Sequence, residues 1–347
     1  MKTLQIKSLN CGYRKQPIIQ NLDLQLNENE ILCLLGSSGC GKTTLLKAIA
    51  GLQPIQSGQI LLAGEDISNR PAEQRRTGFI FQDYALFPHL NAAQNILFGL
   101  SEKDKGEQQE ILEKITALVQ LEGLLQRYPH ELSGGQQQRV AIARSLACQP
   151  KLLLLDEPFS NIDTQVRRQM LEKIRQILKQ QKMSAVFVTH SKEEAFVFAD
   201  RLAIMAQGNI LQTGSAENLY HRPNSKFVAE FLGVVNYLPC RLTSPQSLSS
   251  PLGEYHFNRA LQLADGRPAM QNQNLEWLIR PQHLVLHPDI QSATRIKAKY
   301  FAGAYYQYEL QTGEYYISVQ SVQPLPVGTA VRVEYQHREA LLFASTE

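Results

Sequence analysis

A glycine-rich segment with a lysine and two threonines carries the clearest chemical signal in this sequence. The segment Gly36–Thr44 lies between an apolar run, Ile31–Leu35, and a helix-like run, Leu45–Ala50. It matches the pattern G-x-x-x-x-G-K-[ST] in the strand–loop–helix context that this pattern requires. Backbone N–H groups in such a loop surround phosphate oxygens, and the helix N-terminus adds partial positive charge. The alternative, a Gly/Ser turn that contains a lysine by chance, does not explain both flanks.

We therefore expect this loop to bind a nucleoside triphosphate. Its binding residues would form one continuous stretch: Gly36, Ser37, Ser38, Gly39, Cys40, Gly41, Lys42, Thr43 and Thr44. Lys42 would reach the β- and γ-phosphates, and the Thr43 hydroxyl would ligate Mg²⁺.

Three further apolar runs each end in polar residues suited to phosphate chemistry. They are Thr77–Phe81 before Gln82, Leu152–Leu155 before Asp156 and Glu157, and Ala185–Thr189 before His190. Such runs are typical of strands buried on both faces of a parallel α/β sheet, in which ligands bind beyond the carboxyl ends of the strands. The sequence therefore predicts one site shared with the phosphate loop.

The chemistry of these side chains suggests their roles in phosphoryl transfer. Asp156 would hold Mg²⁺ directly or through water, as a Walker B carboxylate does. Glu157 would polarise the attacking water, and Gln82 would complete the Mg²⁺ shell or contact that water. His190 would contact the γ-phosphate and orient Glu157; the alternative for a lone histidine is a core position.

A second anion-binding pattern lies in Leu132–Arg139, which reads Leu-Ser-Gly-Gly-Gln-Gln-Gln-Arg and precedes a good helix sequence. A serine and two glycines open the helix, where backbone N–H groups attract anions. The nucleotide-binding residues here would be Ser133, Gly134, Gly135 and Gln136.

This set of motifs resembles the ATP-binding subunits of ABC transporters. The resemblance implies ATP and Mg²⁺ as ligands, and a D-loop at Ser160–Asp163. The resemblance also favours stacking of the Tyr13 side chain on the base. Taken alone, an aromatic residue at this position is more typical of a strand. By this resemblance Gly36–Thr44 is the P-loop and Leu132–Gln136 is the signature, and the signature of one subunit closes on the ATP of another. One P-loop and one signature per chain therefore imply a homodimer. Integral-membrane permease subunits, and indirectly an extracytoplasmic substrate-binding protein, are the other implied partners.

The predicted fold has two parts. Residues 1–235 would form an α/β P-loop NTPase domain of the ABC ATPase type with a helical subdomain, opening with antiparallel strands over residues 3–27 and closing with a helix over Tyr220–Leu232. Residues 236–347 are rich in Pro, Ser and Gln and predict a small all-β domain, with a hairpin around Thr312-Gly313. This part resembles the OB-like regulatory extension of importer ATPases.

The segment Asp83–Leu90 follows Gln82 and precedes a polar helical region over Glu102–Gln126. In the family it forms the groove for a coupling helix of the permease. Tyr84, Leu86 and Phe87 would supply the apolar contacts, with core packing as the alternative for each.

Composition excludes several classes of function. A net charge of +3 and the lack of a basic stripe argue against nucleic acid as a partner. The five cysteines are scattered without metal-ligand spacing, which is typical of reduced thiols. No signal peptide or run of 18 apolar residues is seen. We expect a peripheral subunit, held by its permease at the cytoplasmic face of the bacterial inner membrane.

Several stretches resemble the ferric-ion importer subfamily, namely Arg127–Arg139, Lys192–Ala195, Ala199–Arg201 and Leu278–Gln282. Polyamine, sulfate/molybdate and sugar importers are the alternatives. The tyrosines at 305, 306, 308, 315 and 316 alternate as in ordinary strand packing, so we do not read them as iron ligands.

Three other functions fit less well. A soluble ABC ATPase of repair or translation usually carries two cassettes, a coiled-coil insertion or a basic surface, none of which is visible. A P-loop kinase outside the family would lack Leu132–Gln136, and a purely regulatory binder would not need Asp156, Glu157 and His190.

Overall fold

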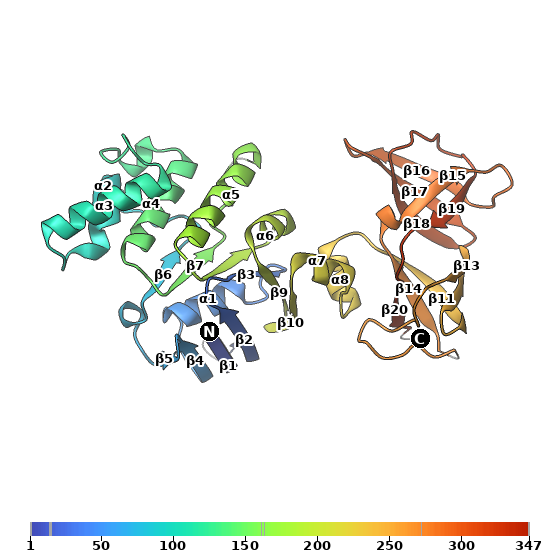
Figure 1. The fold of residues 1–347 in the computed structure, drawn as a ribbon, viewed down its shortest axis with the longest axis horizontal. Coiled ribbons are helices and arrows are strands. Elements are labelled where there is room, and N and C mark those ends of the chain that lie inside the picture. The colour runs from blue at the N-terminus through green and yellow to red at the C-terminus, as the bar shows by residue number, and fades with distance from the viewer. Residues whose placement is uncertain (1, 14–15, 161, 163, 272, 346–347) are drawn as a thin grey trace. The chain divides into compact units, whose positions relative to one another are not determined.

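The computed structural model describes residues 2–13, 16–160, 162, 164–271 and 273–345. These residues form two compact units, Met1–Ala216 and Glu217–Glu347, each with its own hydrophobic cluster (Figure 1). Unit 1 holds every predicted nucleotide-site residue, so its sheets and helices decide how those residues are positioned.

A six-stranded sheet is the centre of unit 1, with strand order β10-β9-β3-β8-β7-β6. The strands are β3 (Ile31–Gly36), β6 (Thr77–Ile80), β7 (Leu152–Asp156), β8 (Ala185–Thr189), β9 (Arg201–Ala206) and β10 (Asn209–Gly214). Strands β9 to β6 pair in parallel, and β10 pairs antiparallel at the edge. Every residue of β3, β7 and β8 is buried, as covered parallel strands require. The four strands predicted from apolar runs are confirmed.

Three helices follow strands of this sheet directly along the chain. They are α1 (Lys42–Ala50) after β3, α5 (Thr164–Gln180) after β7 and α6 (Lys192–Phe198) after β8. On α5 the buried side chains Met170, Leu171, Ile174 and Leu178 share one stripe at helical spacing. Each connecting loop therefore lies at the carboxyl edge of the sheet.

A second, antiparallel sheet has the order β2-β1-β4-β5. Its strands are β1 (Lys2–Tyr13), β2 (Gln16–Asn27), β4 (Ile55–Leu62) and β5 (Glu65–Asp66). Leu4 pairs with Leu26, and Ile6 pairs with Leu24, so the alternating apolar residues share one buried face. The antiparallel pairing predicted over residues 3–27 is confirmed.

The helical subdomain contains α2 (Ala92–Leu97), α3 (Lys105–Val119) and α4 (Gly134–Ala147), which Figure 1 shows grouped together. Short 3₁₀ turns lie at η1 (Ala72–Gln74), η2 (Phe98–Leu100) and η3 (Pro129–Glu131). Helix α4 packs against both α2 and α3. Helix α3 lies within the predicted polar helical region over 102–126. It buries a stripe that includes Leu112, Ile115 and Val119.

Unit 2 contains three antiparallel sheets, with orders β13-β12-β11-β14-β20, β15-β19 and β16-β17-β18. The strands are β11 (Asn236–Ser244), β12 (Ser247–Ser250), β13 (Gly253–His256), β14 (Leu275–Ile279), β15 (Leu284–Pro288), β16 (Arg295–Phe301), β17 (Tyr306–Thr312), β18 (Tyr315–Ser321), β19 (Val331–Tyr335) and β20 (Leu341–Ala344). The predicted hairpin is β17–β18, in which Thr312 pairs with Tyr315. Tyr308 is fully buried and its hydroxyl donates to the carbonyl of Gln323 at 2.6 Å, as a packing role requires.

Two short helices open unit 2 where one helix was predicted over Tyr220–Leu232. Helix α7 (Ala216–His221) ends before Pro223, and α8 (Lys226–Leu232) begins after it. Proline lacks an N–H group and disfavours helical conformation in the residue before it, so the helix breaks there. The prediction of a single helix is wrong.

The two compact units divide between Ala216 and Glu217, whereas the sequence placed the domain boundary at 235/236. The difference arises because Ala229 of α8 packs against Leu278 and Phe343 of the β-rich region. The boundary at 235/236 as a division of function stays a prediction.

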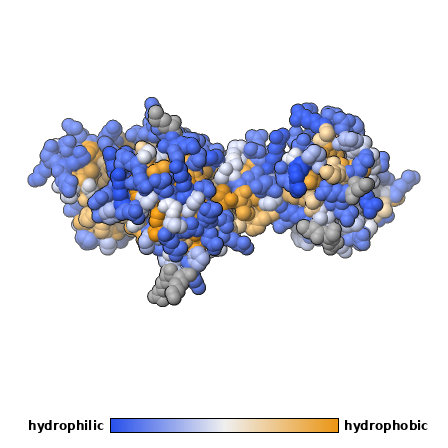
Figure 2. All heavy atoms as spheres, turned by 90° about the horizontal axis from the view of Figure 1, so that it is seen from below, coloured by the Kyte–Doolittle hydropathy of each residue, from blue (hydrophilic) through white to orange (hydrophobic). Residues whose placement is uncertain are grey.

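None of the described helices combines the length and apolar composition needed to cross a bilayer. The face shown in Figure 2 is mostly hydrophilic, with apolar patches between the polar side chains.

Candidate nucleotide-hydrolysis site

The loop Gly36–Thr44 leaves the carboxyl end of β3 and enters α1. Gly39 and Gly41 have φ angles of 78° and 103°, a region that only glycine enters at no steric cost. A Cβ atom at Gly41 would also lie 2.7 Å from Cδ1 of Ile19. These two glycines therefore let the backbone curl in the way that a phosphate-binding loop needs.

Lys42 is buried at the first position of α1. Its Nζ donates to the carbonyl oxygens of Gly36 at 2.8 Å and Ser37 at 2.9 Å. The ammonium group thus lies inside the curl of the loop, where a triphosphate would meet it.

Thr43 and Asp156, two predicted Mg²⁺ ligands, are in direct contact. The Thr43 hydroxyl donates to Oδ1 of Asp156 at 2.9 Å. Burial raises the pKa of Asp156, and the hydrogen bond from Thr43 opposes that rise. A hydroxyl and a carboxylate side by side are hard oxygen donors, so this pair fits a divalent cation such as Mg²⁺.

Gln82, the third predicted Mg²⁺ ligand, lies two residues beyond the end of β6 and is exposed. Because β6 pairs in parallel with β7, Gln82 and Asp156 leave the sheet at the same edge.

The side chains of Glu157 and His190 are in contact, with 3.2 Å between Oε2 and Nδ1. Glu157 has a φ angle of 44°, a strained value for a residue with a side chain. The His190 side chain is 64% exposed, which excludes the alternative of a core histidine. The structure therefore joins the predicted base to the residue predicted to orient it.

Ser133 caps the N-terminus of α4 in a reciprocal arrangement with Gln136. The Gln136 N–H donates to Oγ of Ser133 at 3.4 Å, and the Ser133 N–H donates to Oε1 of Gln136 at 2.9 Å. Across the described residues, no hydrogen bond or ion pair joins 132–136 to the loop 36–44.

Comparison with known proteins agrees with this arrangement. Residues 19–160 match the family model described as ABC transporter. The chain is 38% identical over 357 residues to the Fe(3+) ions import ATP-binding protein FbpC 2 of Haemophilus influenzae, with 98% of this chain and 97% of the relative covered. It is 40% identical over 309 residues to the spermidine/putrescine import ATP-binding protein PotA of Pseudomonas fluorescens, with 85% and 82% covered. The chain belongs to the ATP-binding subunits of ABC transporters.

A solved structure supports the same family. The dimeric, post-hydrolysis state of the ATP-binding cassette MJ0796 bound to ADP and Pi is similar with a TM-score of 0.54 and 26% identity. The similarity covers 61% of this chain and 98% of that one. The nucleotide that this ABC ATPase domain binds is therefore ATP.

Two predicted elements of the ABC site stay predictions. Tyr13 ends β1 with 45% of its surface exposed, so its side chain is accessible, and base stacking stays a prediction. In the D-loop, Asn161 and Asp163 lie outside the described residues. Its first residue, Ser160, donates through Oγ to the Glu157 carbonyl at 3.0 Å.

Sequence reasoning missed the side chains that hold the segment after Gln82. Arg144 of α4 donates to the carbonyls of Tyr84 at 2.9 Å and Ala85 at 2.8 Å, two residues with positive φ. Tyr84 itself is 3% exposed, so for this residue the alternative of core packing holds. In the sequence, no pattern around this arginine, which lies in the helix that follows Leu132–Gln136, indicates the contact.

Asn95, fully buried in α2, holds the other half of the same segment. Its Nδ2 donates to the carbonyls of Phe87 at 3.1 Å and Leu90 at 2.9 Å, and its Oδ1 accepts from the Phe87 N–H. The predicted permease-facing segment is therefore tied to α2 as well as α4.

A buried network also positions the loop of His190. Glu194, only 5% exposed, accepts from the Thr189 hydroxyl at 2.6 Å and pairs with Arg167 at 3.2 Å. The Thr189 hydroxyl also accepts from the Ser191 N–H at 3.0 Å. The stretch Lys192–Ala195, singled out in the sequence for subfamily resemblance, thus has a structural role beside His190.

Proposed function

We propose that two copies of this chain form the ATP-hydrolysing motor of an ABC importer whose cargo is ferric ion. The contact between Thr43 and Asp156 is the observation that supports hydrolysis most directly, since it joins the phosphate loop to the Walker B carboxylate. The pairing of Glu157 with His190 supports a base beside it.

Each of these residues has its own role in phosphoryl transfer. Lys42 binds phosphate oxygens and balances their charge. Glu157 accepts a proton from the attacking water, and His190 orients that carboxylate. Thr43, Asp156 and Gln82 would hold Mg²⁺, which supplies positive charge that stabilises the transferring phosphoryl group.

The proposed partners follow from one P-loop and one signature per chain. A second copy would place its Ser133–Gln136 segment over the ATP held at Lys42, as a homodimer. The dimeric state of the similar solved cassette supports this arrangement. Permease subunits would hold the dimer at the cytoplasmic face of the bacterial inner membrane, with an extracytoplasmic substrate-binding protein acting indirectly and no nucleic acid involved.

The share of the chain that each relative matches supports ferric ion over polyamine as the cargo. The FbpC 2 relative matches 98% of the chain. PotA relatives of two Pseudomonas fluorescens strains match 85% of it at 40% identity and 65% of it at 47% identity. We give more weight to the match that extends over nearly the whole chain.

Uptake of ⁵⁵Fe(III) tests this proposal in cells that lack the chain, complemented with wild type or Glu157→Gln. We expect wild type to restore uptake and Glu157→Gln to leave it at the level of the deletion. Labelled spermidine uptake in the same strains is the matched control. Loss of spermidine uptake with normal iron uptake would assign the motor to polyamine import instead.

A further inference from the structure

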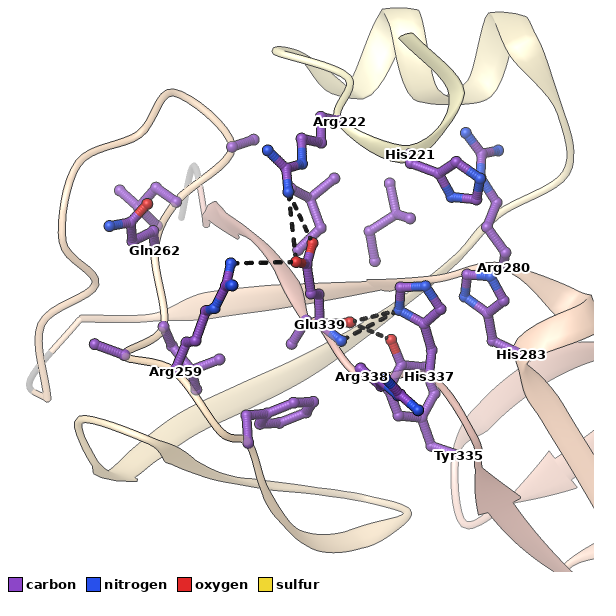
Figure 3. A pocket seen from close by; sticks show the side chains of 18 of the residues that line it. His221, Arg222, Arg259, Gln262, Arg280, His283, Tyr335, His337, Arg338 and Glu339 are labelled. Atoms are coloured by element: carbon purple, nitrogen blue, oxygen red, sulfur yellow. Dashed lines mark hydrogen bonds and ion pairs between the residues drawn. The ribbon is translucent and has the colours of Figure 1, made fainter. Parts of the chain in front are cut away.

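Unit 2 contains a cavity of about 520 Å³ with three histidines in its wall (Figure 3). His221 ends α7, His283 ends the 3₁₀ turn η4 (Pro281–His283), and His337 lies two residues after β19. One nitrogen of each ring lies within 4.8 Å of a nitrogen of the other two. Three separate segments of the chain thus bring imidazole groups to one point.

The hydrogen bonds of these rings leave nitrogens available for a ligand. Nδ1 of His337 lies 3.0 Å from the carbonyl oxygen of Glu339 and 3.3 Å from its N–H. If Nδ1 donates to that carbonyl, Nε2 carries a free lone pair, which is the usual arrangement of a metal-binding histidine. Within the described part of the chain, the ring nitrogens of His221 and His283 form no hydrogen bond.

The three ring planes lie within 9° of parallel, so the rings must turn before their in-plane lone pairs can meet at one ion. The ring planes of His283 and His337 are stacked with centroids 4.2 Å apart, and His221 lies 6.2 Å from His337.

An anion is the competing ligand, because arginines also line the cavity. Arg222 and Arg259 lie 3.4 and 3.9 Å from the carboxylate of Glu339. Arg280 donates to the carbonyls of Ala229 and Gly233 at 3.0 and 3.1 Å. These arginines already have acceptors, so the histidines are the better candidates to bind a ligand.

We infer that His221, His283 and His337 form a site for a divalent transition-metal ion of the Zn²⁺ type. Imidazole nitrogens suit this class of ion, and three of them leave a fourth position open for water. Zn–N bonds of about 2.0–2.1 Å in a tetrahedral site put the nitrogens roughly 3.3 Å apart. The rings must therefore rotate and close by up to about 1.5 Å from their present spacing. The bound ion would link α7 to two points of the β-rich region.

Zn²⁺ binding to the full-length, metal-free chain tests this inference, measured by calorimetry without nucleotide. We expect wild type to bind one ion tightly at this site. His221→Gln and His283→Gln should each weaken that binding by at least about 100-fold, since even outer partners of metal ligands contribute 10–100-fold. His256→Gln is the matched control, because His256 is exposed in the same unit and bonds Ser247 outside the cavity.

Co²⁺ provides a second readout that does not depend on affinity. The wild-type chain should show the visible absorption of tetrahedral Co²⁺ with nitrogen ligands, and His221→Gln should lose it. His221 is exposed, so this variant is expected to fold. Equal Zn²⁺ binding by wild type and both cavity variants would overturn the inference, as would absent binding by wild type. Binding of inorganic phosphate that the cavity variants abolish, with no Zn²⁺ binding, would assign the cavity to anions.

Discussion

The nucleotide edge of unit 1 and the histidine cavity of unit 2 both gather side chains from distant parts of the chain, by different means. At the nucleotide edge, Asp156 ends β7, while Glu157 and His190 directly follow β7 and β8, so parallel pairing brings them together. In the cavity, the histidines come from a helix end, a 3₁₀ turn and a loop. Chemistry at the edge of a parallel sheet can be anticipated from sequence, whereas chemistry built from irregular connections emerges only from the fold.

Glu157→Gln should give the largest difference between the two regions, because it should impair ATP hydrolysis at the nucleotide edge and leave Zn²⁺ binding in the histidine cavity unchanged. Loss of the base is expected to lower kcat for ATP hydrolysis by at least about 10²–10³-fold. ATP affinity should stay intact, and the variant should accumulate as an ATP-bound dimer. Its Zn²⁺ binding should match wild type, and Glu122→Gln, on an exposed residue, serves as the control. Wild-type turnover by Glu157→Gln would remove this residue from the mechanism.

Lys42→Ala should weaken ATP binding itself, and not turnover alone. The change removes the buried ammonium group that contacts the loop carbonyls. Losing one such charge-stabilising contact typically costs about 10²–10³-fold in rate. Equilibrium binding of a fluorescent ATP analogue distinguishes this variant from Glu157→Gln. Lys105→Ala, on exposed surface of α3, should bind like wild type.

Thr43→Val should raise the Mg²⁺ concentration needed for hydrolysis by roughly tenfold or more, by analogy with lost groups around other metals. The substitution removes the hydroxyl that contacts Asp156 while keeping a similar shape. Thr43→Ser keeps the hydroxyl and should stay close to wild type. An Mg²⁺ titration of ATPase activity compares the three proteins, and identical curves for Val and Ser would contradict the assignment.

Arg144→Ala should destabilise unit 1 by about 2 kcal/mol, because hydrogen bonds to a charged group contribute about 1.5–3 kcal/mol. It leaves the carbonyls of Tyr84 and Ala85 without their donor. Urea denaturation measures the loss. Arg168→Ala is the control, since Arg168 is 78% exposed and its ion pair with Glu172 contributes little.

Asp200→Asn should have the smallest effect, about 1 kcal/mol at pH 7. Burial raises the pKa of Asp200, but bonds from Lys179, the Ile31 N–H and Arg175 outweigh it and hold the pKa below its usual range. A depressed pKa means that this stabilisation is present above about pH 4 and is lost as pH falls through the folded-state pKa. Urea denaturation should therefore show a gap between the two proteins at pH 7 that narrows below about pH 4. A gap independent of pH would show that the carboxylate charge does not matter.

The side chains at the nucleotide edge could be predicted from the sequence because each signal there is local. The glycines of the loop 36–44 and the aliphatic run before Asp156 are readable in a few residues. Pro223 also indicates the break between α7 and α8 in the sequence. The prediction of one helix over Tyr220–Leu232 did not take this proline into account.

Contacts between residues far apart in the sequence could not be predicted in this way. Arg144 donates to the carbonyl of Tyr84, 60 residues away, and Arg167 pairs with Glu194, 27 residues away. Both contacts depend on how the elements pack. The left-handed backbone of Glu157 is likewise imposed by its surroundings, since glutamate has no local preference for it.

A mixing experiment tests the central claim, that the ATPase site is completed by a second copy of the chain. Lys42→Ala lacks a working phosphate loop, and Ser133→Arg lacks a working signature, so each variant alone should be inactive. A mixed dimer carries one site with the intact loop of one copy and the intact signature of the other. We predict that mixing the two inactive proteins restores Mg²⁺-dependent ATP hydrolysis. If mixed dimers form and show no activity above the separate variants, the shared site is contradicted.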